Sequence, residues 1–157
     1  DDEFFLQKLV ANKRWKAVYA LGKDTIVRSL PPEKLKGIIN QRLRWGSKGL
    51  YYPPHIKRRA MGIFAFLLGL SLGPALVIAG LMPLWAFLAG AGAKFVMDFL
   101  VMFRGCRLYG FRFPIVSFVL LSIIHPLLIV LSAIGGHFLA FEWKGERFRS
   151  KIKSEGK

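Results

Sequence analysis

Cysteine and acidic residues are scarce in this chain of 157 residues, and both scarcities narrow what it can be. The single cysteine, Cys106, excludes an internal disulfide and gives no sign of an oxidising compartment. Only 9 Asp and Glu oppose 24 Lys and Arg, so the chain is strongly basic. Its first residues, Asp1-Asp2-Glu3, include no Met, basic segment or apolar signal-peptide core, and we expect them to continue a longer protein.

Charge is missing from two long stretches of the chain. Residues 60–93 and 113–141 contain no Lys, Arg, Asp or Glu, although the chain as a whole is 21% charged. A soluble domain mixes charged and apolar residues along its length, so this segregation predicts membrane spans flanked by basic segments. It also argues against a nucleic-acid binder, because the basic residues lie at span boundaries and form no single soluble patch.

The apolar stretch 60–103 is long enough for two spans. As a helix it would measure about 66 Å, more than twice the ~30 Å hydrocarbon core of a bilayer. Gly80 and Pro83 favour a break, which predicts spans over 60–79 and 84–103. The basic residues that flank this pair of spans are Lys57, Arg58, Arg59, Arg104, Arg107 and Arg112. By the positive-inside rule, both flanks belong on the cytoplasmic side.

The last apolar stretch, 113–141, allows two topologies. One tilted span over about 114–140 would place the tail, 142–157, outside, yet this tail carries six Lys and Arg against three Glu. The pair His125-Pro126 could instead break the stretch into a re-entrant hairpin that returns the basic tail to the cytoplasm. Both topologies stay open here, and the basic tail favours the hairpin.

Residues 1–59, which precede the spans, are too few and too charged to bury a core of their own. Apolar residues at helical spacing predict a short amphipathic helix over 2–12. Two β-prone runs, 17–20 and 25–28, predict one or two short strands. We therefore expect the end of a larger domain, followed by a mostly α-helical membrane region.

A further helix is predicted over residues 33 to about 50, opened by Pro31 and Pro32. Its apolar stripe comprises Leu35, Ile38, Ile39 and Leu43, and its basic face comprises Lys34, Lys36, Arg42 and Arg44. A helix of this kind directly before a span is typical of an interfacial helix that lies on the bilayer surface.

Gln41, Arg44 and Trp45 are candidate binding residues near the end of this helix. Their i, i+3 and i+4 spacing makes them neighbours on one side of the helix. An amide can hydrogen-bond to a substrate, a guanidinium can clamp a phosphate with two N–H groups, and an indole can stack on a sugar ring. The simpler interpretation is a basic interfacial helix with an aromatic residue at the membrane boundary.

The acidic start of the chain is a candidate catalytic group. Adjacent carboxylates raise one another's proton affinity, and an aspartate such as Asp2 can act as a base toward a hydroxyl nucleophile. The simpler interpretation is an acidic first turn, which is stabilised by the positive end of a helix dipole.

Taken together, the two groups resemble the membrane-bound family-2 glycosyltransferases of the cellulose-synthase-like and ceramide-glucosyltransferase-like kind. The acidic pair Asp1-Asp2 is followed by Leu9, then after about forty residues by Gln-x-x-Arg-Trp at 41–45, and then by membrane spans. The tail segment 142–148 is also similar to the Trp-Lys/Arg-Gly-x-Arg-aromatic tail of related bacterial enzymes. The resemblance covers most of the chain.

This resemblance implies a role for each candidate residue. Asp2, or Asp1 if the register is shifted by one, would be the catalytic base of an inverting displacement. Gln41 and Arg44 would meet the diphosphate of a nucleotide-sugar donor, and Trp45 would stack near a lipid or glycan acceptor. Residues 1–59 would be the C-terminal edge of a GT-A-type α/β catalytic domain, cytoplasmic and anchored to a bacterial inner membrane by residues 60–141.

The family's nucleotide-binding aspartate and Asp-x-Asp metal motif lie upstream of the acidic pair, and nothing in the sequence precedes Asp1. We therefore expect a divalent metal, Mg²⁺ or Mn²⁺, only in the full-length enzyme, whose N-terminal catalytic portion is missing here. This chain alone should bind neither metal nor donor well and should be inactive. The alternative is a non-enzymatic basic membrane anchor or assembly subunit that binds anionic lipid.

Ionisable side chains also occur inside the predicted spans. Lys94 and Asp98 are spaced i, i+4, which predicts a structural ion pair, since isolated charges in hydrocarbon are costly. A contact to a lipid head group is the other interpretation of this pair. His125 and His137 are predicted to be packed or hydrogen-bonded and not to bind a metal.

Overall fold

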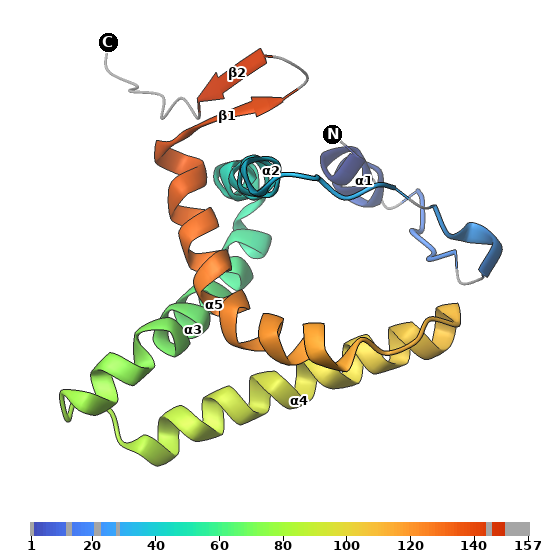
Figure 1. Cartoon of the computed structure of the whole chain (residues 1–157). Coiled ribbons are helices and arrows are strands. Elements are labelled where there is room, and N and C mark those ends of the chain that lie inside the picture. Colours follow the sequence, from blue (N-terminus) through green and yellow to red (C-terminus); the bar gives the residue numbers. More distant parts are fainter. Residues whose placement is uncertain (1, 12–13, 21–22, 28, 144–145, 150–157) are drawn as a thin grey trace, which may run out of the picture.

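The computed structural model describes residues 2–11, 14–20, 23–27, 29–143 and 146–149. This part of the chain is mostly helical (Figure 1). Its α-helices are α1 (Asp2–Ala11), α2 (Leu35–Ser47), α3 (Pro54–Ile78), α4 (Leu84–Tyr109) and α5 (Ile115–Phe138). The smaller elements are the 3₁₀ turns η1 (Lys23–Thr25) and η2 (Lys48–Tyr51) and the strands β1 (Ala140–Trp143) and β2 (Glu146–Arg149).

Helices α3, α4 and α5 are each long and apolar enough to cross a membrane. They cover the three predicted spans, but α3 already begins at Pro54 and α4 continues to Tyr109. The flanking basic residues therefore belong largely to the end turns of the spans and not to loops. Between 6% and 17% of the most apolar window of each helix is buried by protein, which is consistent with helices that lie in a membrane.

The predicted break between the first two spans is a tight turn. Gly80 adopts a positive φ of 71°, which favours glycine, and Pro83 stands immediately before α4. Next to this turn, Gly73 of α3 packs against Phe87 of α4 so closely that a Cβ at Gly73 would overlap the ring. The turn and this contact join α3 and α4 at the end of the molecule farthest from α2 (Figure 1).

The third stretch is one bent helix, α5, and not two helices separated at His125-Pro126, whereas the side of the membrane on which the tail lies stays a prediction. α5 contains Pro126 in its interior, and Figure 1 shows a sharp bend near the middle of the helix. Proline lacks an N–H group and crowds the preceding turn, which kinks a helix without reversing its direction. The bend carries the chain back to α2, where Glu142 of β1 lies 3.4 Å from Nζ of Lys36. The tail thus begins beside α2, as the hairpin topology required.

The strands predicted at 17–20 and 25–28 are absent from the described residues. Residues 15–20 have no regular structure, η1 covers Lys23–Thr25, and residue 28 lies outside the described part. Val18, Tyr19 and Val27 have exposures of 87%, 89% and 91%. Short β-prone segments do not hold a strand without a partner and an apolar surface to pack on. The described residues before α2 therefore contain no strand that would belong to the predicted edge of an α/β domain.

In the described part of the chain, a two-stranded sheet forms at the start of the tail, where no strand was predicted. β1 and β2 are antiparallel, with Phe141 opposite Phe148 and Glu142 opposite Arg147. The rings of the two Phe residues stack with centroids 6.0 Å apart, and Phe141 is buried. The hairpin packs on α2 and lies at the end of α5 (Figure 1). Residues 150–157 of the tail lie outside the described residues.

Candidate functional site

Helix α2 is fixed to the C-terminal half of α5 by glycine contacts. A Cβ at Gly46 would overlap the backbone oxygen of Ser132, and a Cβ at Gly136 would lie 2.5 Å from the backbone nitrogen of Ser47. At Gly135 it would lie 2.7 Å from Cδ2 of Leu43, which is the buried residue of α2. The two backbones therefore touch, as small residues allow between membrane helices. This contact holds the last turns of α2 in a fixed position.

Those last turns carry the three candidate binding residues. Gln41, Arg44 and Trp45 belong to one uninterrupted helix, so they lie on one side of it as predicted. Gln41 and Arg44 are half-buried, and Trp45 is 44% exposed. The hydroxyl of Ser47 donates a hydrogen bond to the carbonyl of Arg44 at 2.8 Å. The structure thus presents these side chains at the surface on a rigidly packed helix.

Arg42 is a neighbour of this group that sequence reasoning placed only on the basic face of the helix. Its guanidinium carbon lies 5.1 Å from the centre of the Trp45 ring, within range for a cation–π interaction. This contact restricts the orientation of the indole ring. The i, i+3 spacing of Arg42 and Trp45 was the available signal.

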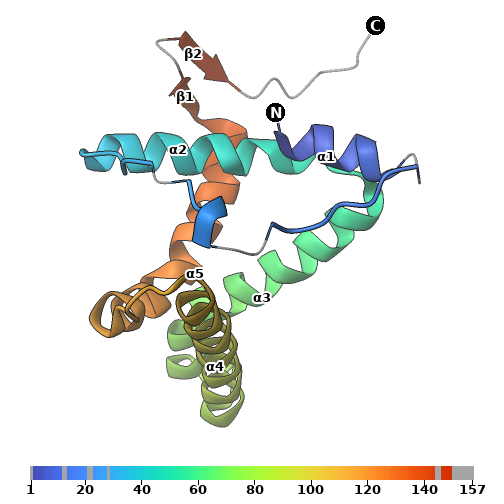
Figure 2. The same cartoon turned by 90° about the vertical axis from the view of Figure 1, so that its right-hand side faces the viewer.

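Helix α1 lies beside the end of α2, with the ring centroids of Phe4 and Tyr52 5.9 Å apart (Figure 2). α1 begins at Asp2, the candidate base, so both candidate groups occur at the same end of the molecule. The side chain of Asp2 and the whole of Asp1 lie outside the described residues. The contact between Phe4 and Tyr52 therefore fixes the position of helix α1, but it does not give the position of the Asp2 carboxylate.

Polar side chains of the long helices α4 and α5 also form contacts with one another and with the backbone. Lys94 and Asp98 form the predicted i, i+4 ion pair, and Lys94 Nζ also donates to the backbone oxygen of Ser122 at 3.3 Å. Nδ1 of His137 lies 2.6 Å from the backbone oxygen of Ala133. Nδ1 of His125 is buried and has no hydrogen-bond partner among the described residues. His137 is thus hydrogen-bonded and His125 is packed, and both arrangements agree with the predicted environment of these side chains.

The residues present do not fit a metal centre. Across the described ranges, no three His, Cys, Asp or Glu side chains gather closely enough to hold an ion. The divalent metal expected from the family resemblance remains a prediction.

Known proteins offer no guide to this site. Comparisons of the chain with models of protein families, with curated proteins and with solved structures find no match.

Proposed function

We propose that this chain is the membrane-anchoring C-terminal part of a family-2 glycosyltransferase that transfers a sugar from a nucleotide-sugar donor to a lipid or glycan acceptor. The observation that supports this most is the packing of α2 on α5. It holds Gln41, Arg44 and Trp45 on one helix at the end of three membrane-length helices. A purely basic lipid anchor has no need for an amide, a guanidinium and an indole on one fixed side.

In this proposal Arg44 meets the donor diphosphate with its planar guanidinium, which matches the geometry of phosphate oxygens. Gln41, one turn earlier, hydrogen-bonds to the same group, and Trp45 offers a flat apolar face to the acceptor. The acceptor hydroxyl attacks the anomeric carbon while Asp2 takes its proton. The bond from that carbon to the diphosphate breaks, and the fixed positive charge of Arg44 stabilises the departing anion.

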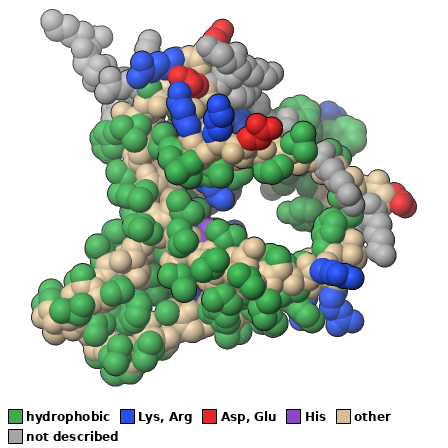
Figure 3. Space-filling view, in the orientation of Figure 1, with side chains coloured by type: hydrophobic (Ala, Val, Ile, Leu, Met, Phe, Trp, Pro, Cys, Tyr) green, Lys and Arg blue, Asp and Glu red, His purple; other side chains and the backbone are tan. Residues whose placement is uncertain are grey.

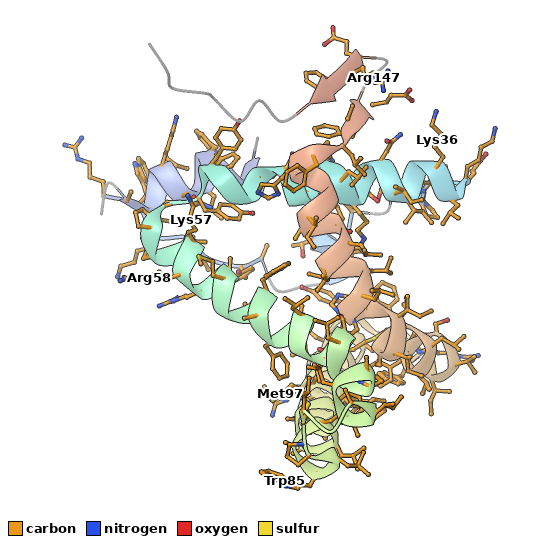
Figure 4. All side chains as sticks on the ribbon, turned by 90° about the vertical axis from the view of Figure 1, so that its left-hand side faces the viewer. Lys36, Lys57, Arg58, Trp85, Met97 and Arg147 are labelled. Atoms are coloured by element: carbon orange, nitrogen blue, oxygen red, sulfur yellow. The ribbon has the colours of Figure 1, made fainter. Side chains whose placement is uncertain are left out.

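The site is proposed to lie at the cytoplasmic surface of a bacterial inner membrane. Leu35, Ile38 and Ile39 of α2 are exposed, which suits an interfacial helix with its apolar face in the bilayer. Hydrophobic side chains cover most of the long helices, whereas Lys and Arg gather around α2 and the hairpin and in a second group at the far end of α4 (Figure 3). Figure 4 shows Lys57 and Arg58 near the α2 end and Trp85 at the opposite end of the molecule. Basic residues at one end are expected on the cytoplasmic side.

The remaining parts of the enzyme belong upstream in this proposal. Residues 1–59 form the end of a GT-A-type catalytic domain, and the donor pocket and its metal lie in the missing N-terminal portion. The product would be a glycolipid or polysaccharide of the cell envelope.

Arg44→Lys in the full-length enzyme tests the proposal. Lysine keeps the charge and loses the two-pronged fork, so we expect donor affinity or turnover to fall by about tenfold or more, roughly 1.4 kcal/mol. Nucleotide-sugar binding and turnover are measured on purified protein in neutral detergent. The matched control is Arg58→Lys, which makes the same exchange at an exposed basic residue of α3.

The competing function is a non-enzymatic anchor or assembly subunit that binds anionic lipid, and the basic residues around α2 favour it. Under that function only charge matters, so Arg44→Lys and Arg58→Lys should both behave like the parent protein. Unchanged donor affinity and turnover in Arg44→Lys would therefore sink the diphosphate clamp and support the anchor.

A further inference from the structure

A cavity of about 350 Å³ lies between α3, α4 and α5. Its walls include Ser71, Phe87, Lys94, Ser122 and Pro126. Ile123, which also lines the cavity, is 74% exposed, so the cavity opens at the surface of the long helices. In a membrane this surface faces lipid, and a chain from the bilayer can enter.

The bend of α5 accounts for this space. Before the bend, α5 is held to α4 by a cluster of rings in which Phe118 contacts Phe95, Phe99 and Phe113. After the bend, α5 turns toward α2 and leaves α4 (Figure 1). Pro126 stands in the wall at this divergence, so the cavity is built by the fold of the helix backbones.

The polar side chains that line the cavity are Lys94, Ser71 and Ser122. Lys94 has three N–H donors, of which Asp98 and the backbone oxygen of Ser122 take two among the described residues. The third can donate to an oxygen of a bound molecule. The hydroxyls of Ser71 and Ser122 each donate to a carbonyl of their own helix at 2.8 Å, so their oxygens remain able to accept. The cavity thus offers both a donor and acceptors to one hydroxyl group.

Charge decides which molecule suits this site. The positive charge of Lys94 is offset by Asp98, and most other wall residues are apolar. An anionic head group would find no uncompensated positive charge there and would be costly to desolvate. A neutral hydroxyl group would find a hydrogen-bond donor in Lys94 and acceptors in the two serine oxygens. The volume equals roughly a dozen water-sized groups, enough for that hydroxyl and the adjoining part of one chain.

We propose that this cavity is a binding site for a neutral, hydroxyl-bearing lipid of the diacylglycerol class. The lipid oxygen accepts a hydrogen bond from Lys94, its hydroxyl donates to Ser71 or Ser122, and part of one hydrocarbon chain fills the apolar remainder. This site goes beyond the proposed transfer reaction and does not depend on it.

The experiment is photo-labelling of the full-length protein in phosphatidylcholine nanodiscs. The probe is a diacylglycerol with a diazirine near the ester end of one acyl chain, and a phosphatidic acid with identical chains is compared with it. We expect the diacylglycerol to label peptides of α4 and α5 that line the cavity, with labelling by phosphatidic acid at least about fivefold weaker, roughly 1 kcal/mol. Equal or stronger labelling by phosphatidic acid, or labels confined to other helices, would overturn the proposal.

Two variants test the cavity itself. Ala91→Phe fills it, and Ala93→Phe adds the same ring at an exposed residue of the same helix that does not line it. Labelling should fall about fivefold or more in Ala91→Phe and stay at the parent level in Ala93→Phe. Equal labelling of the two variants would contradict the site.

The double variant Lys94→Met/Asp98→Asn tests the polar contact without leaving one buried charge alone. It should lose the preference for diacylglycerol over phosphatidic acid, and an unchanged preference would refute the role of Lys94. If Ala91→Phe does not fold, the labelled positions in the parent protein and the double variant still decide the proposal.

Discussion

The contact between α2 and α5 gives the sharpest prediction, because two glycines fill places where any Cβ collides. In Gly46→Ala the new methyl group overlaps the backbone oxygen of Ser132. Backbone atoms cannot rotate away as a flexible side chain can, so the two helices must separate. The same argument applies to Gly136→Ala, whose Cβ would lie 2.5 Å from the nitrogen of Ser47.

Two opposing terms set the magnitude. Replacing a helical glycine by alanine favours the helix by about 1 kcal/mol. Overpacking a tight contact costs about 1–3 kcal/mol. Gly92 of α4 supplies the control, since a Cβ there meets nothing within 4 Å. The difference in unfolding free energy between Gly46→Ala and Gly92→Ala isolates the overpacking cost, so we expect Gly46→Ala to be less stable by about 1–3 kcal/mol.

Thermal unfolding in detergent, followed by intrinsic fluorescence, measures this difference. For chains of this size, 1 kcal/mol corresponds to about 2–4 °C in Tm. Gly46→Ala should therefore unfold below Gly92→Ala by roughly 2–12 °C. Under the proposed function, Gly46→Ala should also weaken nucleotide-sugar binding, because the helix that carries Arg44 moves. Equal or higher stability of Gly46→Ala would refute the close packing of α2 on α5.

Two further predictions concern carboxylates. Under the proposed function, Asp2→Asn should lower turnover by about a hundredfold to ten-thousandfold and leave donor binding largely intact, because the amide keeps the shape and loses the base. Turnover within about threefold of the Glu3→Gln control would show that Asp2 is not the base. Asp98→Asn should destabilise the protein in detergent by about 1–3 kcal/mol, between the values for exposed and for fully buried ion pairs, since Lys94 is buried but the Asp98 side chain is 42% exposed. Adding Lys94→Met should recover part of that loss, and additive losses in the double variant would contradict the pairing.

The part of the site that lies on the single helix α2 was predicted from the sequence. The i, i+3, i+4 spacing of Gln41, Arg44 and Trp45 is a local pattern, and α2 satisfies it. The stacking of Arg42 on Trp45 has the same local origin and was missed. The position of α1 could not be predicted, because it depends on Phe4 meeting Tyr52 across a long separation in the chain.

The sequence by itself determined the features that arise within single segments. Long, mostly apolar stretches favour helices that can cross a bilayer, so α3, α4 and α5 follow from composition. Gly80 and Pro83 end and restart a helix through their own backbone preferences. The Lys94–Asp98 pair follows from helical geometry together with the cost of an isolated charge in lipid.

Only the tertiary structure decided how these segments meet. Nothing local distinguishes Gly46 and Gly136 from the glycines that face open space, because their role depends on residues about ninety positions apart. Pro126 indicated a break in α5, but packing on α2 at one end and on α4 at the other decides that the helix bends instead of reversing. The failed strands at 17–20 and 25–28 and the unforeseen β1–β2 hairpin have the same cause. A strand forms where a partner and an apolar surface are within reach, and only the folded chain supplies them.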